Sequence, residues 1–278
     1  MTVRLAALAA FFAGLFAAPA YASEPINWRL GLQEAATPTM ERIDSLHDFM
    51  TIIMAVITLF VTVLLIYTMW RFSEKRNPTP STTTHHTGLE VAWTMIPVFI
   101  LIIIAVPSFK LLYFADRTVE PDMTLKIIGH QWYWSYEYPD HGDFTFDAAM
   151  LDDDEREPGQ PRLLATDEAV VMPVNTNIRL LIAANDVLHA WAIPAFGVKL
   201  DAVPGRLGET WVRVEKEGTY YGQCSELCGT GHGFMPIMVK VVSKEAFAAW
   251  VKMAKEEYAA RDEKSSVKLA AAKVGTAQ

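Results

Sequence analysis

The segment from Tyr221 to Pro236 gathers side chains that bind metal ions and carry electrons. It holds two thiols, a carboxylate, an imidazole and a thioether, carried by Cys224, Cys228, Glu226, His232 and Met235. A second imidazole, His189, lies upstream in a stretch that the sequence pattern predicts to be a strand. Thiolate and thioether ligands combined with imidazole favour copper. The pattern therefore indicates a copper site, and the two thiolates could bridge two copper ions, with one histidine on each.

Two other uses of the cysteine pair are open. Two cysteines at this spacing in an exported domain could form a disulfide, and cysteine with histidine could hold zinc. A disulfide would not require His232 and Met235, nor the glycines that punctuate the segment at Gly229, Gly231 and Gly233. A thioether ligand favours copper over zinc. Because the chain has 2 cysteines, a four-cysteine zinc or iron–sulfur site within it is excluded.

The composition points to membrane segments. Of the 278 residues, 51% are hydrophobic and only 20% are charged. No charge interrupts the runs Phe49–Trp70 and Val91–Phe109, and about 20 apolar helical residues span a bilayer. We therefore expect two transmembrane helices, at about residues 46–71 and 90–114, that form a hairpin.

The N-terminus resembles a secretory signal. Arg4 precedes the apolar run Leu5–Ala18, and Ala20-Tyr21-Ala22 has the small-x-small pattern of a cleavage site. The alternative is a short N-terminal membrane helix, but the run is too short and ends at Pro19. We expect residues 1–22 to be a cleaved signal peptide.

The orientation of the hairpin follows from the basic residues between its helices. Arg71, Lys75 and Arg76 lie in this short connection, which the positive-inside rule places in the cytoplasm. The N- and C-termini of the mature chain would then lie on the outer, periplasmic side of a bacterial cytoplasmic membrane. The signal peptide predicts the same topology.

After residue 116 the apolar pattern alternates with period two, which is typical of an all-β sandwich or barrel. The expected strands are Thr124–Ile128, Gln131–Tyr138, Ala169–Val174, Ile178–Ala183, Leu188–Ile193, Glu209–Val214, Thr219–Gly222 and Pro236–Val242. The predicted organisation is a signal peptide at 1–22, a membrane segment at 23–115, an exported β domain at 116–243, and a short helix with a disordered tail at 244–278.

The exported domain is strongly acidic. From Asp116 to Lys240 there are twenty acidic and ten basic residues, and the whole chain has a net charge of −8. Such a balance excludes nucleic acid as the main partner, because phosphate binding requires clustered cations. An acidic face instead steers a basic protein partner toward its binding site.

Five motifs in this chain resemble those of subunit II of haem–copper cytochrome c oxidases, and the resemblance covers nearly all of the chain after residue 22. They are Gly129-His-Gln-Trp-Tyr-Trp-Ser-Tyr-Glu-Tyr138, Asp186-Val-Leu-His189-Ala-Trp191, Asp201-Ala-Val-Pro-Gly-Arg206, Gly222-Gln-Cys-Ser-Glu-Leu-Cys-Gly229 and His232-Gly-Phe-Met-Pro236. The resemblance implies a cupredoxin fold and a binuclear copper centre called CuA.

The resemblance also implies the metal ligands. The copper ligands would be His189, Cys224, Cys228, His232, Met235 and the backbone carbonyl of Glu226. The carboxylate of Glu226 would bind magnesium or manganese at the interface with subunit I, because carboxylate oxygen suits a hard cation. Haems would be bound only in subunit I, so this chain has no oxygen-reducing site of its own.

By the same resemblance, the chain works as a subunit of the proton-pumping oxidase, with cytochrome c as electron donor. Subunit I, subunit III and membrane lipid would be its other partners. Trp132 would receive the electrons, and Glu90 would stand at the mouth of a proton channel in subunit I. The docking carboxylates would be Glu137, Asp143, Asp147, Asp167 and Asp186.

Three other functions fit the sequence less well. A quinol oxidase subunit II shares the fold but lacks the copper ligands, whose side chains are all present here. An exported copper-delivery or structural binding protein would not need Glu90, two membrane helices and an acidic face together. A nitrous oxide reductase would need a large catalytic domain that 278 residues do not accommodate.

Overall fold

The structure of the chain, a computed structural model, describes residues 22–23, 26, 28–117 and 119–258. It divides into a helical unit, Glu41–Arg117, and a β unit made of Met1–Met40 and Thr118–Gln278. The predicted signal peptide at 1–22 falls almost entirely outside the described residues, as does the predicted tail after residue 258.

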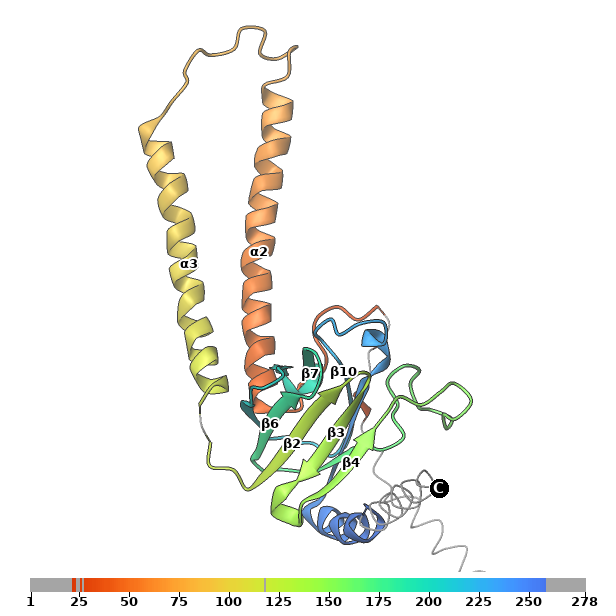
Figure 1. The fold of residues 1–278 in the computed structure, drawn as a ribbon. Helices are drawn as coiled ribbons and strands as arrows, with labels where there is room; N and C mark the ends of the chain where they lie inside the picture. Colours follow the sequence, from red (N-terminus) through yellow and green to blue (C-terminus); the bar gives the residue numbers. More distant parts are fainter. Residues whose placement is uncertain (1–21, 24–25, 27, 118, 259–278) are drawn as a thin grey trace, which may run out of the picture. The chain divides into compact units, whose positions relative to one another are not determined.

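The helical hairpin consists of α2 (Pro38–Arg71) and α3 (Thr87–Ala115), both long and apolar enough to cross a membrane (Figure 1). The first helix begins well before the expected residue 46. Thr37 caps it by accepting a hydrogen bond from the Met40 amide at 3.0 Å, and Pro38 occupies the first helical position, where no amide hydrogen is needed. His86 caps α3 in the same way, through the amide of Leu89.

The β unit is built from three sheets within the described residues. The larger sheet has the order β4 (Phe144–Ala148), β3 (Tyr133–Tyr138), β2 (Met123–His130), β6 (Ile178–Ala184) and β9 (Gly208–Val212). The second has the order β1 (Ala22–Ser23), β10 (Gly218–Gln223), β11 (Pro236–Val242) and β5 (Val170–Pro173). A hairpin of β7 (His189–Ile193) and β8 (Val198–Ala202) completes the unit.

Each expected strand overlaps a strand of the structure, but β4 and β8 were not expected. Both are short, and both alternate apolar with polar residues, as in Phe-Thr-Phe-Asp-Ala of β4. They follow the tight turns that contain Gly142 and Gly197, which have positive φ angles of 98° and 65°. The period-two signal was therefore present in the sequence, but it spans only five residues in each case.

The core of the β unit lies between the two larger sheets. β2 and β6 alternate buried and half-buried residues along their length, so one face of each points into the core. Trp134, Tyr136 and Leu180 are fully buried there. The Tyr138 hydroxyl joins the sheets, donating to the Val171 carbonyl at 3.0 Å and accepting from the Val171 amide at 3.1 Å. The predicted cupredoxin-like sandwich is confirmed.

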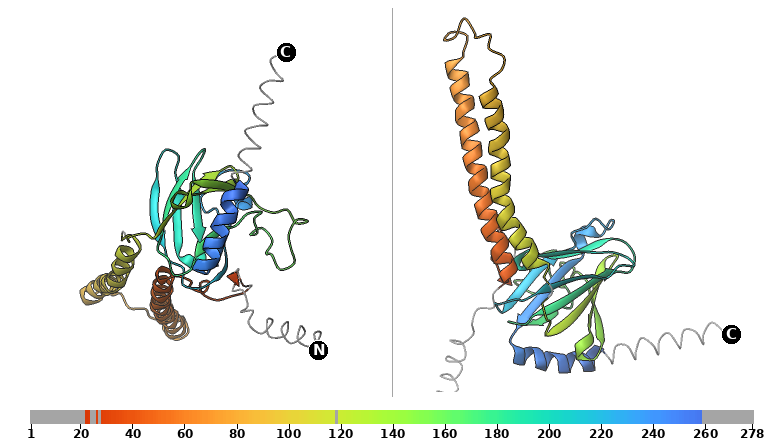
Figure 2. Two further views of the ribbon diagram at one scale, coloured as in Figure 1. Left: turned by 90° about the horizontal axis from the view of Figure 1, so that it is seen from below. Right: turned by 90° about the vertical axis from the view of Figure 1, so that its left-hand side faces the viewer.

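A helix at residues 244–258 covers one end of this sandwich (Figure 2). It follows β11 directly, so it lies at the opposite end of that strand from the loop that joins β10 to β11. Its Trp250 and Tyr258 rings pack against Phe144 and Phe146. This end of the unit is closed by aromatic packing.

Candidate metal centre

The candidate ligands come from two places that the fold brings together. Cys224 and Met235 flank the loop between β10 and β11, and His189 begins β7. The amide of Ser225 donates to the Ala190 carbonyl at 3.0 Å, which ties this loop to β7. Gly222 of β10 allows this strand to approach β7 closely, because a Cβ at position 222 would overlap the carbonyl of Ala192 in β7.

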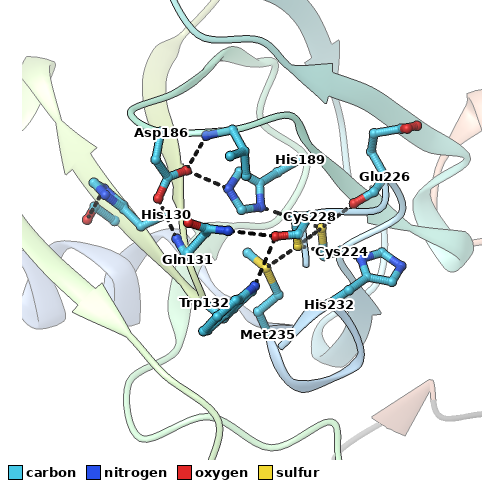
Figure 3. Close-up of polar contacts among 12 residues, drawn as sticks. His130, Gln131, Trp132, Asp186, His189, Cys224, Glu226, Cys228, His232 and Met235 are labelled. Carbon is cyan, nitrogen blue, oxygen red and sulfur yellow. Dashed lines mark hydrogen bonds and ion pairs between the residues drawn. The ribbon is translucent and has the colours of Figure 1, made fainter. Parts of the chain in front are cut away.

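The ligand atoms form one connected cluster around the two sulfur atoms (Figure 3). The Cys224 and Cys228 sulfurs lie 3.8 Å apart, and His189 Nδ1 lies 3.8 Å from the Cys224 sulfur. The Cys228 sulfur lies 3.6 Å from His232 Nδ1 and 3.5 Å from the Met235 sulfur. The Glu226 carbonyl lies 3.4 Å from the Cys224 sulfur. The structure therefore brings together all six residues that the resemblance implies as copper ligands.

Both cysteines are free and buried in the structure, so they do not form the disulfide that the sequence left open. Burial, and then the neighbouring Cys224 sulfur, raise the pKa of the Cys228 thiol to about 12. Without a metal the Cys228 thiol is therefore protonated at neutral pH, and metal binding there must displace its proton. Two sulfurs, two imidazole nitrogens, a thioether and a carbonyl fit a pair of soft copper ions.

Asp186 orients His189. The His189 Nε2 atom lies 2.9 Å from an Asp186 carboxylate oxygen, which leaves Nδ1 as the lone-pair nitrogen facing Cys224. The Asp186 carboxylate also accepts from the amides of Gln131 at 2.7 Å and Val187 at 2.6 Å. Burial acts to raise its pKa, but the hydrogen bonds from His189 and the two amides outweigh burial, so the pKa lies below the usual range. Asp186 is therefore held ionised against the imidazole.

The β2–β3 hairpin covers the other side of the sulfur cluster. The Trp132 indole nitrogen donates to the carbonyl of Cys228 at 3.1 Å, and the Gln131 side-chain amide donates to the same oxygen at 2.9 Å. The Trp132 side chain packs directly on the loop, because a Cβ on Gly231 would overlap its ring. Trp132 remains 37% exposed. It therefore contacts solvent and a candidate metal ligand at once.

The predicted docking acids have different surroundings. Glu137 forms an ion pair with Lys126 at 2.7 Å, and Asp147 accepts a hydrogen bond from Ser135. These residues share the outward face of the larger sheet, where Ser135 pairs with Asp147 in the β3–β4 register. Asp143 is the last residue of the turn before β4, and Asp167 accepts a hydrogen bond from the Ala149 amide at 2.7 Å. The Asp186 carboxylate is hydrogen-bonded to His189.

Two predicted carboxylates lie away from the sulfurs. The Glu226 side chain points away from the cluster while its carbonyl faces Cys224 (Figure 3), and no described residue hydrogen-bonds to its carboxylate. Glu90 lies in the first turn of α3 in the helical unit, where its side chain accepts from the His86 amide at 3.3 Å. Neither carboxylate is a ligand in the sulfur cluster.

Sequence reasoning missed Gln131 and gave Asp186 only a docking role. The aspartate three residues before His189 could have signalled the second role, because ligating histidines are oriented by carboxylates. No sequence feature indicates that the Gln131 amide reaches Cys228, because the two residues meet only through the fold.

Comparison with known proteins identifies the family. Residues 123–242 match the family model described as cytochrome c oxidase subunit II, periplasmic domain, and residues 25–111 match its transmembrane domain. A probable cytochrome c oxidase subunit 2 of Rickettsia bellii is 50% identical over 253 residues, covering 91% of this chain and 94% of the relative. The chain belongs to the cytochrome c oxidase subunit II family.

Other members of the cytochrome c oxidase subunit II family are similarly related. The subunit 2 of Oenothera berteroana is 50% identical over 236 residues, covering 83% of this chain and 91% of the relative. The solved periplasmic domain of subunit II from Bradyrhizobium japonicum is 53% identical, covering 51% of this chain and 99% of that chain, with a TM-score of 0.48.

Membership of this family makes the chain a membrane-anchored component of the haem–copper cytochrome c oxidase complex. The cluster of His189, Cys224 and Cys228, whose ligand atoms lie within 4.8 Å of one another, is consistent with the CuA copper site of cytochrome c oxidase subunit II.

Proposed function

We propose that this subunit receives electrons from reduced cytochrome c at Trp132 and relays them toward the haems of subunit I. Oxygen is reduced in subunit I, and the reaction is coupled to proton pumping. Two copper ions, when bound by His189, Cys224, Cys228, His232, Met235 and the Glu226 carbonyl, supply a one-electron carrier. The family assignment and the connected set of ligand atoms support this role.

The contact between Trp132 and Cys228 carries the proposal. An exposed edge of the indole can touch a partner, while the indole nitrogen donates to the backbone of Cys228 at 3.1 Å. The remaining path to the sulfur is covalent. Gln131 donates to the same carbonyl oxygen, and Gly231 allows the ring to pack closely, so the indole has a fixed position.

Acidic residues spread along β3 and β4, from the strand ends near Trp132 to Asp143 at the opposite end of the sheet, support a basic donor. Asp147 and Glu137 lie on the outward face of the strands that lead to Trp132, and Asp143 and Asp167 flank β4. Complementary charge accelerates encounter, and salt weakens it. We therefore propose that this face docks the lysine-rich side of cytochrome c, with Asp186 contributing charge although it is bound to His189.

Replacing Trp132 with alanine tests this assignment. A central aromatic of an interface contributes about 2 kcal/mol or more, so we expect oxidation of reduced cytochrome c to slow by at least about 30-fold. Stopped-flow absorbance at low and high salt measures the rate. Trp132→Phe keeps a ring but lacks the indole N–H, so it separates contact area from the hydrogen bond to Cys228. Both variants should keep the copper absorption of the wild type. Loss of this absorption would contradict the proposal that Trp132 serves electron entry and not copper binding.

We propose a second metal site on Glu226. Its carboxylate has no hydrogen-bonding partner among the described residues, and its side chain points away from the sulfurs (Figure 3). A carboxylate suits Mg²⁺ or Mn²⁺, whereas the carbonyl of the same residue faces the soft site. In the oxidase complex, Glu226→Gln should remove bound manganese but leave copper in place, because the substitution keeps the carbonyl.

We also propose that the hairpin crosses a bacterial cytoplasmic membrane with both chain ends outside, after removal of residues 1–22. The basic residues at the end of α2 and just after it, Arg71, Lys75 and Arg76, support this orientation. Glu90 would then lie at the cytoplasmic surface, where it could collect protons for a channel in subunit I. Glu90→Gln should slow proton-linked turnover of the oxidase in proteoliposomes. Unchanged turnover would contradict that role.

A further inference from the structure

A groove of about 440 Å³ lies between α2 and α3, at the end of the hairpin where α2 begins and α3 ends. Its polar lining consists of Arg42, Ser45 and Lys110. The rest of the lining is apolar and includes Leu46, Phe49 and Leu111. The groove therefore combines two cations with a hydrocarbon-like wall.

Helix geometry gives the groove its positive charge. At 3.6 residues per turn, Arg42, Ser45, Leu46 and Phe49 share one face of α2, whereas Glu41, Asp44 and Asp48 fall on the other side. On α3, Lys110 faces the groove with Leu111.

Neither cation of the groove has an acidic partner within the part of the chain that the structure describes. The Arg42 guanidinium instead lies over the Phe114 ring, 4.0 Å from its centroid. This contact orients the guanidinium but leaves its charge uncompensated. The two cations can therefore accept an anionic group.

The groove lies at the level where a membrane changes from hydrocarbon to headgroups. Lys110 directly follows the uncharged run that ends at Phe109, and Arg42 and Ser45 precede the run that begins at Phe49. A phospholipid combines a phosphate at this level with acyl chains below it. Basic pockets between membrane helices bind anionic headgroups.

We propose that this groove binds the headgroup of an anionic phospholipid. The Arg42 guanidinium and the Lys110 ammonium hold the phosphate, and an acyl chain lies along Leu46 and Phe49. A zwitterionic headgroup is disfavoured because it would bring its own cation toward the two side chains.

The test uses the whole oxidase complex. Wild type and Arg42→Gln/Lys110→Gln are exchanged into nanodiscs of phosphatidylcholine with a minority of phosphatidylglycerol, then transferred to detergent for native mass spectrometry. We expect wild type to retain one phosphatidylglycerol that the double variant loses. Arg71→Gln/Lys75→Gln removes the same charge at the other end of the hairpin and should retain it. Arg42→Lys/Lys110→Arg keeps the charge, should also retain it, and shows that substitution alone does not disrupt the hairpin.

Three results would overturn the proposal. One is equal phosphatidylglycerol retention in the wild type and the double glutamine variant, and another is retention of phosphatidylcholine in its place. The third is a crosslink from position 110 to a carboxylate of another oxidase subunit with no lipid bound, which would make the groove a protein interface.

Discussion

The two ends of the β unit are organised by different interactions. At one end, the two cysteine sulfurs lie 3.8 Å apart, and a ligand atom of each of three further side chains lies 3.5–3.8 Å from one of these sulfurs. At the other end, the Phe144 ring stacks on Tyr138 with centroids 4.9 Å apart and packs against Trp250 of the terminal helix at 5.7 Å. Within the described residues, the cluster of histidine and cysteine side chains that could hold a metal ion lies at the first end.

The aromatic end contributes to the stability of the fold, whereas the sulfur end contributes to metal binding. The aromatic end contributes burial of large apolar surface, which stabilises any ligation state of the site. The sulfur end brings together atoms that could hold a metal, and metal binding there would stabilise the folded state. Substitutions at the aromatic end should therefore change the free energy of unfolding, and substitutions at the sulfur end should change the affinity for copper.

Phe144→Ala tests the aromatic end and should have the largest effect on stability. Truncating a buried phenylalanine costs about 3–5 kcal/mol of unfolding free energy. Denaturant unfolding of the full chain in detergent measures the loss, and copper absorption below the transition should be unchanged. Phe234→Ala is a matched control in the metal loop, where the ring is 51% exposed and should contribute little. Equal losses in the two variants would contradict the division between the ends.

Asp186→Asn tests the sulfur end and should have a smaller effect, on copper affinity. The Nε2 atom of His189 loses its carboxylate partner, and loss of such a partner lowers metal affinity by roughly 10- to 100-fold. Competition with a copper chelator measures the affinity of the full chain in detergent. Asp147→Asn removes one negative charge from a residue bonded to Ser135, away from the ligands, and should bind copper like wild type. Identical affinities in both variants would show that Asp186 does not orient the ligand.

Elements that depend on local patterns could be predicted from sequence. The membrane helices follow from uncharged runs, and the strands from period-two alternation. The apolar run alone predicts too late a start for α2, because the Thr37 cap and Pro38 begin the helix before that run. The short strands β4 and β8 carry too few residues for the pattern to stand out.

The ligand set could be predicted because most of it lies in one segment with distinctive spacing. What surrounds the set depends on contacts between residues distant in sequence. Trp132 and Gln131 donate to the Cys228 carbonyl although they lie almost a hundred residues away in the sequence. The sequence does not reveal this contact, because it depends on how the strands pair in the fold. Asp186 was recognised as an acid, but its hydrogen bond to His189 decides its role.

The central claim is that Cys224 and Cys228 bridge two coppers that share one electron. Electron paramagnetic resonance of the copper-loaded full chain in detergent tests it most directly, with Cys228→Ser as the control that removes one bridge. One unpaired electron shared equally by two copper nuclei of spin three-halves gives seven hyperfine lines. We expect seven lines from wild type and none of that pattern from the variant. A four-line spectrum from wild type would show a single copper and contradict the binuclear site.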